Sequence, residues 1–125
     1  MQPEPDQRFP RNKRLTAAAD YRFVFAEPQR LSTPSYTVLV RANERQTNRI
    51  GIVVSRKVAA HAVQRNRIKR LVRESFRHQQ QKGLDGFDIV VIARHGIAKK
   101  NNNSLFSELE AQWSRLARWK KSSSS

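Results

Sequence analysis

The sequence has no cysteine, few acidic residues and no long apolar run. Without cysteine, the 125-residue chain forms no disulfide, binds no zinc through sulfur and offers no thiolate nucleophile. No apolar run approaches the roughly 18–20 residues of a membrane-spanning helix, and the first ten residues lack the apolar core of a secretory signal. We therefore expect a soluble, cytoplasmic protein with no membrane partner.

Clusters of side chains suited to catalysis are also absent from the sequence. Its ten acidic residues are scattered, and His61, His78 and His95 stand far apart. A phosphodiesterase that works with two metal ions needs carboxylates that converge on them, and general acid–base catalysis needs positioned partners. We therefore expect no catalytic residue and no metal site in the chain.

The length is that of one domain, and 38% hydrophobic residues are sufficient for one core. Residues 1–13 contain three prolines among mixed charges, whereas residues 120–125 are only lysine and serine. We expect an irregular arm over residues 1–13, a single domain over residues 14–119 and a flexible tail over residues 120–125. Trp119 lies beyond the clear helical pattern and receives no role.

Basic residues dominate the charge balance. The chain has 25 Lys and Arg against 10 Asp and Glu, a net charge of +15, and its pI is near 11.5. Nine of these cations and only one acid lie between Arg56 and Lys82. Six of the nine are arginines, whose planar guanidinium groups match phosphate oxygens. This run favours a nucleic-acid partner over an evenly solvated basic surface or an anionic membrane.

Hydrophobic periodicity predicts three strands. Alternation over residues 36–41 indicates one strand, and apolar runs over residues 50–54 and 87–93 indicate two more. We expect the first two strands to pair as antiparallel neighbours, because a short polar turn over residues 43–48 separates them. Gly51 weakens the second strand and marks a place where another chain approaches closely.

Helical spacing predicts a helix on either side of these strands. The first follows Thr16, its expected N-cap, and stops at Pro28. The last begins at a cap formed by Asn103 or Ser104. With a third helix between the second and third strands, the order is α-β-β-α-β-α, which predicts a single-domain α+β sandwich.

That middle helix is expected from Ala62 to Gln80. At about 100° per residue, apolar Ile68, Leu71, Val72 and Phe76 fall on one side. The opposite side carries Asn66, Lys69, Arg70, Arg73 and Arg77, flanked by Arg65 and Arg67. We expect Arg67 and Arg70 both to point away from the core, and Arg70 to pair with Glu74 four residues later.

Several segments resemble the bacterial ribonuclease P protein family. The run RNRIKRLVRESFR at residues 65–77 is similar to the family's signature helix. The family pattern RLxxxxDFxxVF resembles residues 14–25, and the strand patterns xxGxxVSKK and DxVVIAR resemble residues 50–57 and 88–94. The resemblance covers about residues 9–118 in order. Tyr21 in place of Phe, and Ala60-His61 in place of Gly-Asn, depart from the pattern.

The resemblance implies both a fold and a function. The fold is similar to the second domain of ribosomal protein S5, with a left-handed β-α-β crossover that opposes the usual preference. The function is that of the protein subunit of an endonuclease that removes the 5′ leader from precursor tRNA. In that family a catalytic RNA holds the magnesium ions and breaks the bond. The protein therefore needs no cofactor and no obligate protein partner.

The resemblance also implies two groups of site residues. Contacts with the catalytic RNA are expected from Arg56, Lys57, Arg65, Asn66, Arg67, Lys69, Arg70 and Arg73. A groove for the single-stranded leader is expected from Tyr21, Phe25 and Tyr36, because unpaired bases stack on aromatic rings. Spacing alone fits equally well with Tyr21 and Phe25 as core residues, and only the resemblance favours the groove.

Three other classes of protein stay open on the residues alone. A ribosomal or general RNA-binding protein on the same fold would show no preference for precursor tRNA. A self-sufficient nuclease is disfavoured by the scattered acids. A DNA-binding module is disfavoured because no reader helix with suitable flanks is present.

Overall fold

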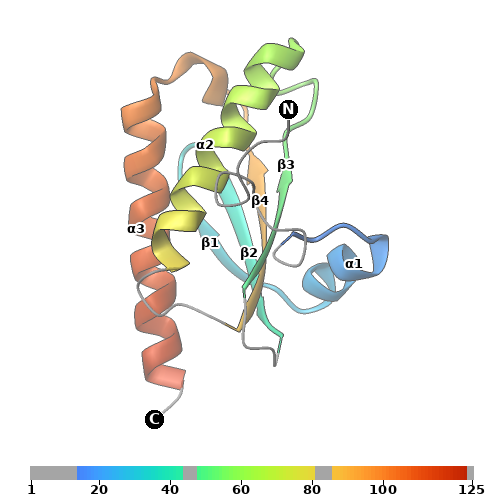
Figure 1. Ribbon diagram of the computed structural model, residues 1–125, viewed down its shortest axis with the longest axis vertical. Coiled ribbons are helices and arrows are strands. Elements are labelled where there is room, and N and C mark those ends of the chain that lie inside the picture. The colour runs from blue at the N-terminus through green and yellow to red at the C-terminus, as the bar shows by residue number, and fades with distance from the viewer. Residues whose placement is uncertain (1–13, 44–47, 81–85, 124–125) are drawn as a thin grey trace, which may run out of the picture.

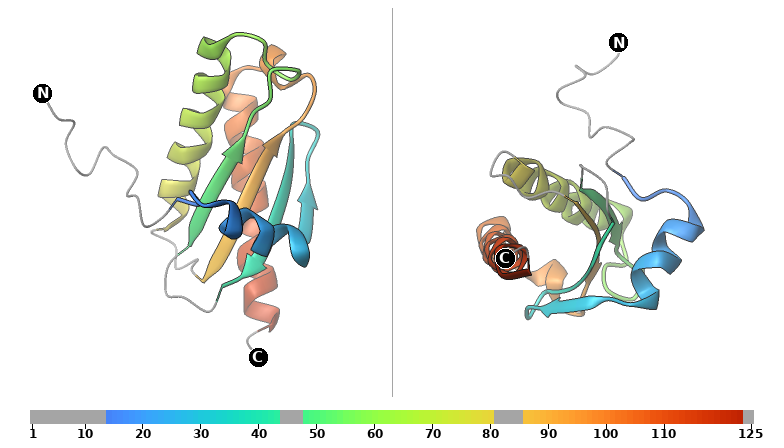
Figure 2. Two further views of the ribbon diagram at one scale, coloured as in Figure 1. Left: turned by 90° about the vertical axis from the view of Figure 1, so that its right-hand side faces the viewer. Right: turned by 90° about the horizontal axis from the view of Figure 1, so that it is seen from below.

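A four-stranded sheet forms the centre of the protein, with helices on both faces (Figure 1). The computed structural model describes residues 14–43, 48–80 and 86–123, with side chains through His78 in the second helix and Arg118 in the last. In chain order the elements are α1 (Ala18–Ala26), β1 (Gln29–Ser32), β2 (Tyr36–Ala42), β3 (Arg49–Val53), α2 (Ala62–Gln80), β4 (Phe87–Ala93), the 3-10 helix η3 (Ile97–Lys99) and α3 (Asn102–Ser123). Helices α2 and α3 cover one face of the sheet, and α1 lies across the other (Figure 2).

The strand order is β1-β2-β4-β3, so the expected pairing of the second and third strands is wrong. Strand β4 lies between them, antiparallel to β2 and parallel to β3. Six of its seven residues are buried, whereas β2 and β3 both end in exposed residues. The most apolar strand thus occupies the centre, where both of its faces are covered.

The connection from β3 through α2 to β4 has the left-handed sense that the family resemblance implied. In the left view of Figure 2 both strands run upward, α2 lies behind them, and β4 is to the right of β3. A right-handed crossover would place β4 on the other side. The α+β class and the crossover are both confirmed.

Strand β1 was not predicted from the sequence. It pairs with β2 in antiparallel register, Leu31 opposite Val38. Only Leu31 of its four residues is buried, so the segment gives almost no alternating signal. Its turn into β2 is closed by Thr33, whose backbone N–H donates to Tyr36 O at 2.8 Å and whose Oγ1 accepts from Tyr36 N at 2.9 Å.

Two helix starts differ from the predicted caps by one to three residues. Ala17, not Thr16, is the N-cap of α1, and its backbone N–H donates to Asp20 Oδ2 at 3.3 Å. Asn101 precedes α3, and its Oδ1 accepts from Ser104 N–H at 2.8 Å. Asn101 therefore performs the capping expected of Asn103 or Ser104, because an amide oxygen satisfies a free amide of the first turn.

The limits of the predicted domain are partly revised. Helix α2 spans the predicted residues, whereas α3 continues to Ser123, beyond the predicted end of the domain at residue 119. The proposed arm over residues 1–13 and the last two residues of the tail lie outside the described residues, as do residues 44–47 of the predicted turn and the side chain of Trp119.

The larger core lies between the sheet and the two long helices. Ile68, Val72 and Phe76 of α2 are fully buried in it, together with Trp113 of α3. The Phe76 and Trp113 rings meet edge to face at 5.8 Å, and the indole Nε1 donates to buried Ser75 Oγ at 2.8 Å. This packing fixes the rotation of α2 about its own axis, because a turn of the helix would break the ring contact and the hydrogen bond.

A smaller core and one ion-pair network hold α1 on the opposite face. Val24 packs there against Leu39 and Val90. Asp88, fully buried on β4, accepts two hydrogen bonds from the Arg49 guanidinium, at 3.0 and 2.7 Å. Arg49 also reaches Asp20 of α1 at 3.3 Å. The bidentate pair compensates the buried charge and ties α1 to β3 and β4.

Glu108 of α3 makes a comparable set of polar contacts on the face of the sheet that α2 and α3 cover. Its carboxylate accepts from Ser35 N at 3.0 Å, Ser35 Oγ at 2.7 Å and Lys100 Nζ at 3.3 Å. Burial alone would raise the pKa of Glu108, but hydrogen bonds from Ser35, Thr33 and Lys100 outweigh it and leave that pKa below its ordinary value. The ionised form is therefore the one that the fold stabilises.

Replacing Glu108 by Gln should lower the free energy of unfolding at pH 7 by about 1–2 kcal/mol, because a neutral amide accepts these bonds less strongly. Since the folded-state pKa is depressed, the wild-type advantage is present above about pH 4.5 and is lost as the pH falls further. Urea unfolding of both proteins between pH 7 and pH 3 measures the gap. A gap that stays constant over this range would contradict the assignment.

Candidate nucleic-acid interface

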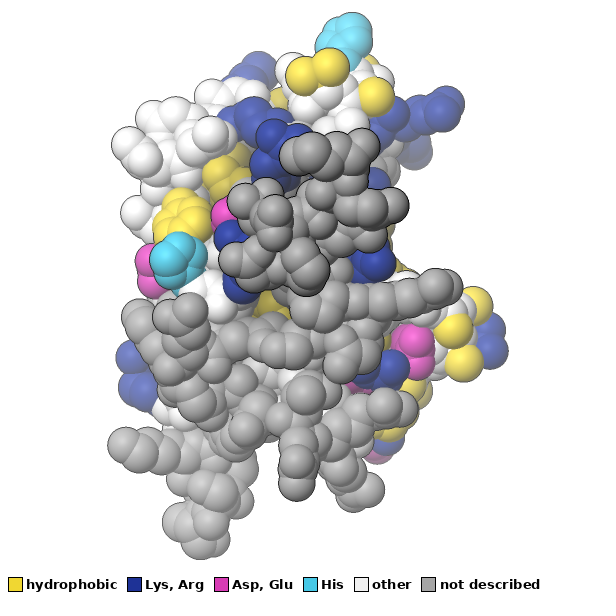
Figure 3. Space-filling view, viewed as in Figure 1, with side chains coloured by type: hydrophobic (Ala, Val, Ile, Leu, Met, Phe, Trp, Pro, Cys, Tyr) yellow, Lys and Arg dark blue, Asp and Glu magenta, His cyan; other side chains and the backbone are white. Residues whose placement is uncertain are grey.

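Helix α2 presents polar and basic residues on the side opposite its buried residues. Asn66 and Arg70 are exposed, and Lys69 and Arg73 are half-buried along the same side. We call these four residues the cationic face. In Figure 3, Lys and Arg side chains gather over the part of the surface where α2 begins.

The cationic face has no acidic partner in the described parts of the chain. Its three cations, Lys69, Arg70 and Arg73, form none of the ion pairs found there. Glu74, the nearest acid in sequence, pairs with Arg77, so the expected Arg70–Glu74 pair is wrong. Three like charges within about one turn of one another therefore repel until an external anion compensates them.

Arg65 and Arg67 turn toward neighbouring backbone. Arg65 Nη1 donates to the carbonyls of Ala59 and Ala60, at 2.9 and 2.8 Å. Arg67 donates to Asn102 Oδ1 and, at 3.4 Å, to the Lys100 carbonyl. The expectation that Arg67 points away from the core is therefore wrong, and only Arg70 fulfils it. Both arginines flank the cationic face, and from there their long side chains reach the adjoining loops.

Arg56 and Lys57 precede α2 on an exposed turn. Ser55 forms this turn, since its carbonyl accepts from Val58 N at 3.2 Å and from Ala59 N at 3.0 Å. Both basic side chains are exposed. They extend the basic surface beyond the start of the helix.

A cavity of about 160 Å³ joins the cationic face to α1 and β3. Lys69 and Arg73 line it from α2, and Arg14 lines it from the segment before α1. Burial and the nearby charge of Arg14 lower the pKa of the Arg73 guanidinium. Arg14 was not among the predicted site residues, although it opens the motif that resembles the family. Three cations thus surround a space that no described carboxylate lines.

Tyr21 lines the same cavity and packs directly on Gly51. A Cβ atom added to Gly51 would lie 2.5 Å from Tyr21 Oη, so only glycine leaves room for the ring. The Tyr21 hydroxyl donates to the Leu15 carbonyl at 3.3 Å. Burial, and then the charge of Asp20, raise the pKa of this hydroxyl. The close approach predicted at Gly51 is real, but it is made by this chain's own Tyr21.

The two other predicted groove residues lie on opposite faces of the sheet. Phe25, one turn after Tyr21 on α1, is 48% exposed and lies on the α1 side. Tyr36 is wrongly predicted as a groove residue, because its ring is fully buried between the sheet and the long helices. Burial, and then the charge of Glu108, raise the pKa of Tyr36. A strand places alternate side chains on opposite faces, and periodicity alone does not say which face is open.

The described residues contain no group of three or more His, Asp or Glu side chains that could hold a metal ion. Within the same part of the chain, no helix has the length and apolar character needed to cross a membrane.

Comparisons with known proteins agree on one family. A family model described as Ribonuclease P matches residues 9–117. The ribonuclease P protein component of Salmonella arizonae is 47% identical over 110 residues, which cover 88% of this chain and 92% of the relative. The corresponding Salmonella typhimurium protein is 46% identical over the same shares of both chains.

Solved structures give the same result. The RNase P protein from Thermotoga maritima superposes with a TM-score of 0.73 at 35% identity, covering 82% of this chain and 96% of that one. The Staphylococcus aureus RNase P protein also gives a TM-score of 0.73, at 30% identity, covering 79% and 90%.

Fold and surface define the class as a small α+β protein that displays one basic helix face. The basic helix, α2, connects the two parallel strands β3 and β4. The chain belongs to the ribonuclease P protein family. As a member it takes part in tRNA processing as a protein component that works with an RNA subunit. The family expected from the run at residues 65–77 is confirmed.

Replacing Arg67 by Ala should destabilise the protein by about 1–2 kcal/mol, because the carbonyls and amide that it binds lose their donor. Replacing exposed Arg70 by Ala should change stability by less than about 0.5 kcal/mol. Urea unfolding followed by circular dichroism measures both variants. Equal effects of the two substitutions would refute the different placements of these side chains.

Proposed function

We propose that the cationic face of α2 binds phosphates of the catalytic RNA subunit. The observation that carries the proposal is the absence of any described acidic partner for Lys69, Arg70 and Arg73 on a helix whose rotation is fixed by its buried side. Phosphates supply the missing counter-charge, and guanidinium groups bind them in bidentate geometry. Asn66 adds an amide that bonds a base edge or a ribose hydroxyl.

The remaining predicted RNA contacts divide into two kinds. Exposed Arg56 and Lys57 are free to meet phosphate directly. Arg65 and Arg67 already bind backbone carbonyls, so we assign them to holding the loops beside the cationic face. Each guanidinium has five N–H donors, and those left over remain available to RNA.

We further propose that the 5′ leader of precursor tRNA lies along the α1 side of the sheet. Tyr21 lines the cavity between α1 and β3, and Phe25 extends the aromatic surface outward. Arg14, Lys69 and Arg73 border that cavity, so backbone charge and aromatic stacking are available together. This combination suits a single strand of variable sequence, because every base has a face to stack.

In this proposal the RNA subunit holds the magnesium ions and breaks the phosphodiester bond. The acids that the structure describes support this division of labour. Asp88, Glu74 and Glu108 are each engaged in ion pairs within the chain. Among the described residues no group of acids and histidines suits a metal ion, and in this proposal the protein's part is to bind and to orient.

Adding the chain to the cognate catalytic RNA should accelerate cleavage of precursor tRNA at low magnesium concentration, where RNA alone folds and binds poorly. Replacing Arg70 by Glu should raise the protein concentration needed for half-maximal rate by about tenfold, because one phosphate contact is lost and a repulsion is added. Multiple-turnover cleavage of a labelled precursor measures both effects.

The matched control is Arg115→Glu, which makes the same charge change on an exposed position of α3. It should need no more than about twice the wild-type concentration, since net charge alone acts weakly at physiological salt. No acceleration by the wild-type chain would exclude the proposed function. Equal losses in the two variants would exclude the cationic face as the contact.

A further inference from the structure

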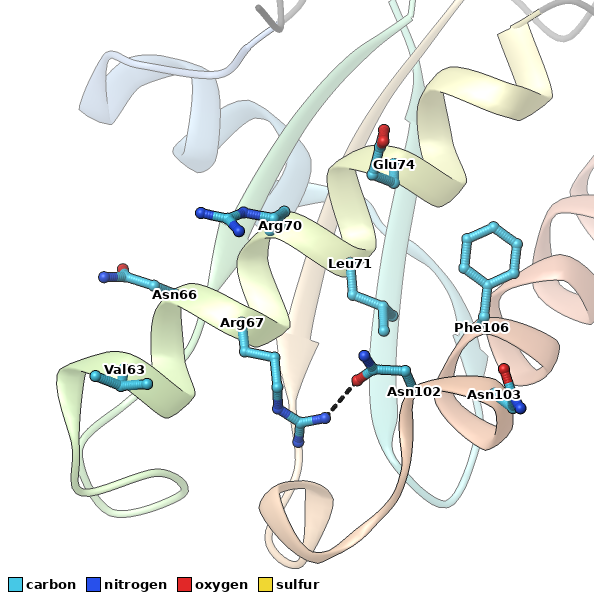
Figure 4. Close-up of a pocket in the computed structure, with 9 residues that line it drawn as sticks. All are labelled: Val63, Asn66, Arg67, Arg70, Leu71, Glu74, Asn102, Asn103 and Phe106. Carbon is cyan, nitrogen blue, oxygen red and sulfur yellow. Dashed lines mark hydrogen bonds between the residues drawn. The ribbon is translucent and has the colours of Figure 1, made fainter. Parts of the chain in front are cut away.

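A second concave surface lies between α2 and α3, on the opposite side of the sheet from α1 (Figure 4). Its volume is about 740 Å³. From α2 it is lined by Val63, Asn66, Arg67, Arg70, Leu71 and Glu74, and from α3 by Asn102, Asn103 and Phe106. We call this space the interhelical groove. None of the roles described above uses its α3 side.

The floor of the interhelical groove is apolar. Leu71 is buried beneath it, and half-buried Phe106 faces it from α3 (Figure 4). The Phe106 ring meets the His78 ring edge to face at 6.2 Å, which fixes its position across the groove. Val63 at the open end is 79% exposed, the most exposed large hydrophobic side chain among the described residues. A flat apolar ligand would cover these surfaces.

The rim of the groove is polar and offers both hydrogen-bond donors and acceptors to a ligand. Arg67 donates to Asn102 Oδ1, which turns the Asn102 amide, and none of the hydrogen bonds among the described residues uses its NH₂ group. Asn103 is exposed and offers a complete amide. Glu74 accepts from Arg77 at the far side and presents a carboxylate, the group that accepts from exocyclic base amines.

Positive charge stands beside this rim. Arg70 belongs to both the groove and the cationic face, and it has no ion pair among the described residues. Arg67 donates only to neutral acceptors there, so its charge is also uncompensated. The groove is thus continuous with the surface assigned to RNA phosphates.

We propose that the interhelical groove binds one unpaired nucleotide of the RNA subunit, an inference that rests on the proposed function. The base lies against Leu71 and Phe106, its edge meets the amides of Asn102 and Asn103, and its phosphate meets Arg70. Stacking needs a base that is free of a duplex, which makes the ligand an unpaired or bulged nucleotide. A neutral peptide, or a second copy of this basic chain, would leave the cations beside the rim without counter-charge.

The absence of cysteine makes a direct test available. Asn103→Cys places a single thiol on the rim, to which a short azidophenacyl photocrosslinker is attached. The matched control is Ser114→Cys, also exposed on α3 and eleven residues later, about 16 Å further along the helix. Each labelled chain is assembled with the full catalytic RNA, and crosslinked nucleotides are mapped by primer-extension stops.

The label at position 103 should crosslink to one nucleotide or a short unpaired segment of the RNA subunit, which the label at position 114 leaves unmodified. Phe106→Leu, which keeps most of the apolar volume and removes the aromatic face, should weaken RNA binding by about fivefold. It should also lower the crosslink yield of the label at position 103 under subsaturating protein.

Several results would overturn the inference. They are a crosslink to precursor tRNA only, a crosslink between two copies of the chain, the same RNA stops from both labels, or no crosslink in an active complex. Cleavage assays on the unlabelled chain separate the two proposals. If the chain accelerates cleavage without a specific crosslink, the groove assignment alone fails. If it does not accelerate cleavage, the proposed function fails, and the groove assignment that rests on it fails as well.

Discussion

The burial of one side of α2 against the sheet is the constraint on which the proposed interface depends. Ile68, Val72 and Phe76 are fully enclosed, and each lies about one turn from the next. Since the helix cannot rotate without exposing them, Asn66, Lys69, Arg70 and Arg73 are held on the outer side. Nothing in the cationic face itself stabilises this arrangement. The apolar side positions charges that would otherwise repel one another apart.

The acidic residues Asp20, Asp88 and Glu108 form their ion pairs away from the cationic face. Asp88 and Asp20 meet Arg49 beneath α1, and Glu108 meets Lys100 beside the start of α3. The Arg49 pairs join elements that are distant in sequence, and Glu108 joins α3 to Ser35 before β2, so the few acids of a basic chain stabilise its tertiary structure. Lys69, Arg70 and Arg73 of α2 have no acidic partner among the described residues and are left for an external one. One helix thereby borders the α1 cavity on one side and the interhelical groove on the other.

Local signals in the sequence were sufficient to predict α2, β4 and the outward placement of Lys69, Arg70 and Arg73. Each of these depends on the pattern of apolar residues within one segment. Partners distant in sequence were not predictable in this way. The insertion of β4 between β2 and β3, the loop contacts of Arg65 and Arg67 and the burial of Tyr36 all depend on which segments meet in space. Strand β1 escaped detection because one buried leucine in four residues makes no pattern. The crossover sense came only from the family resemblance, since general rules favour the opposite hand.

The central claim is that the outer side of α2 carries charges that only RNA phosphates neutralise. The dependence of the RNA association constant on salt concentration tests it most directly, because each phosphate contact releases counterions and steepens the logarithmic slope. Replacing Arg70 by Ala should reduce the magnitude of that slope by about one, whereas Arg115→Ala on α3 should leave it unchanged. A shallow slope, or one that Arg70→Ala does not alter, would contradict the account.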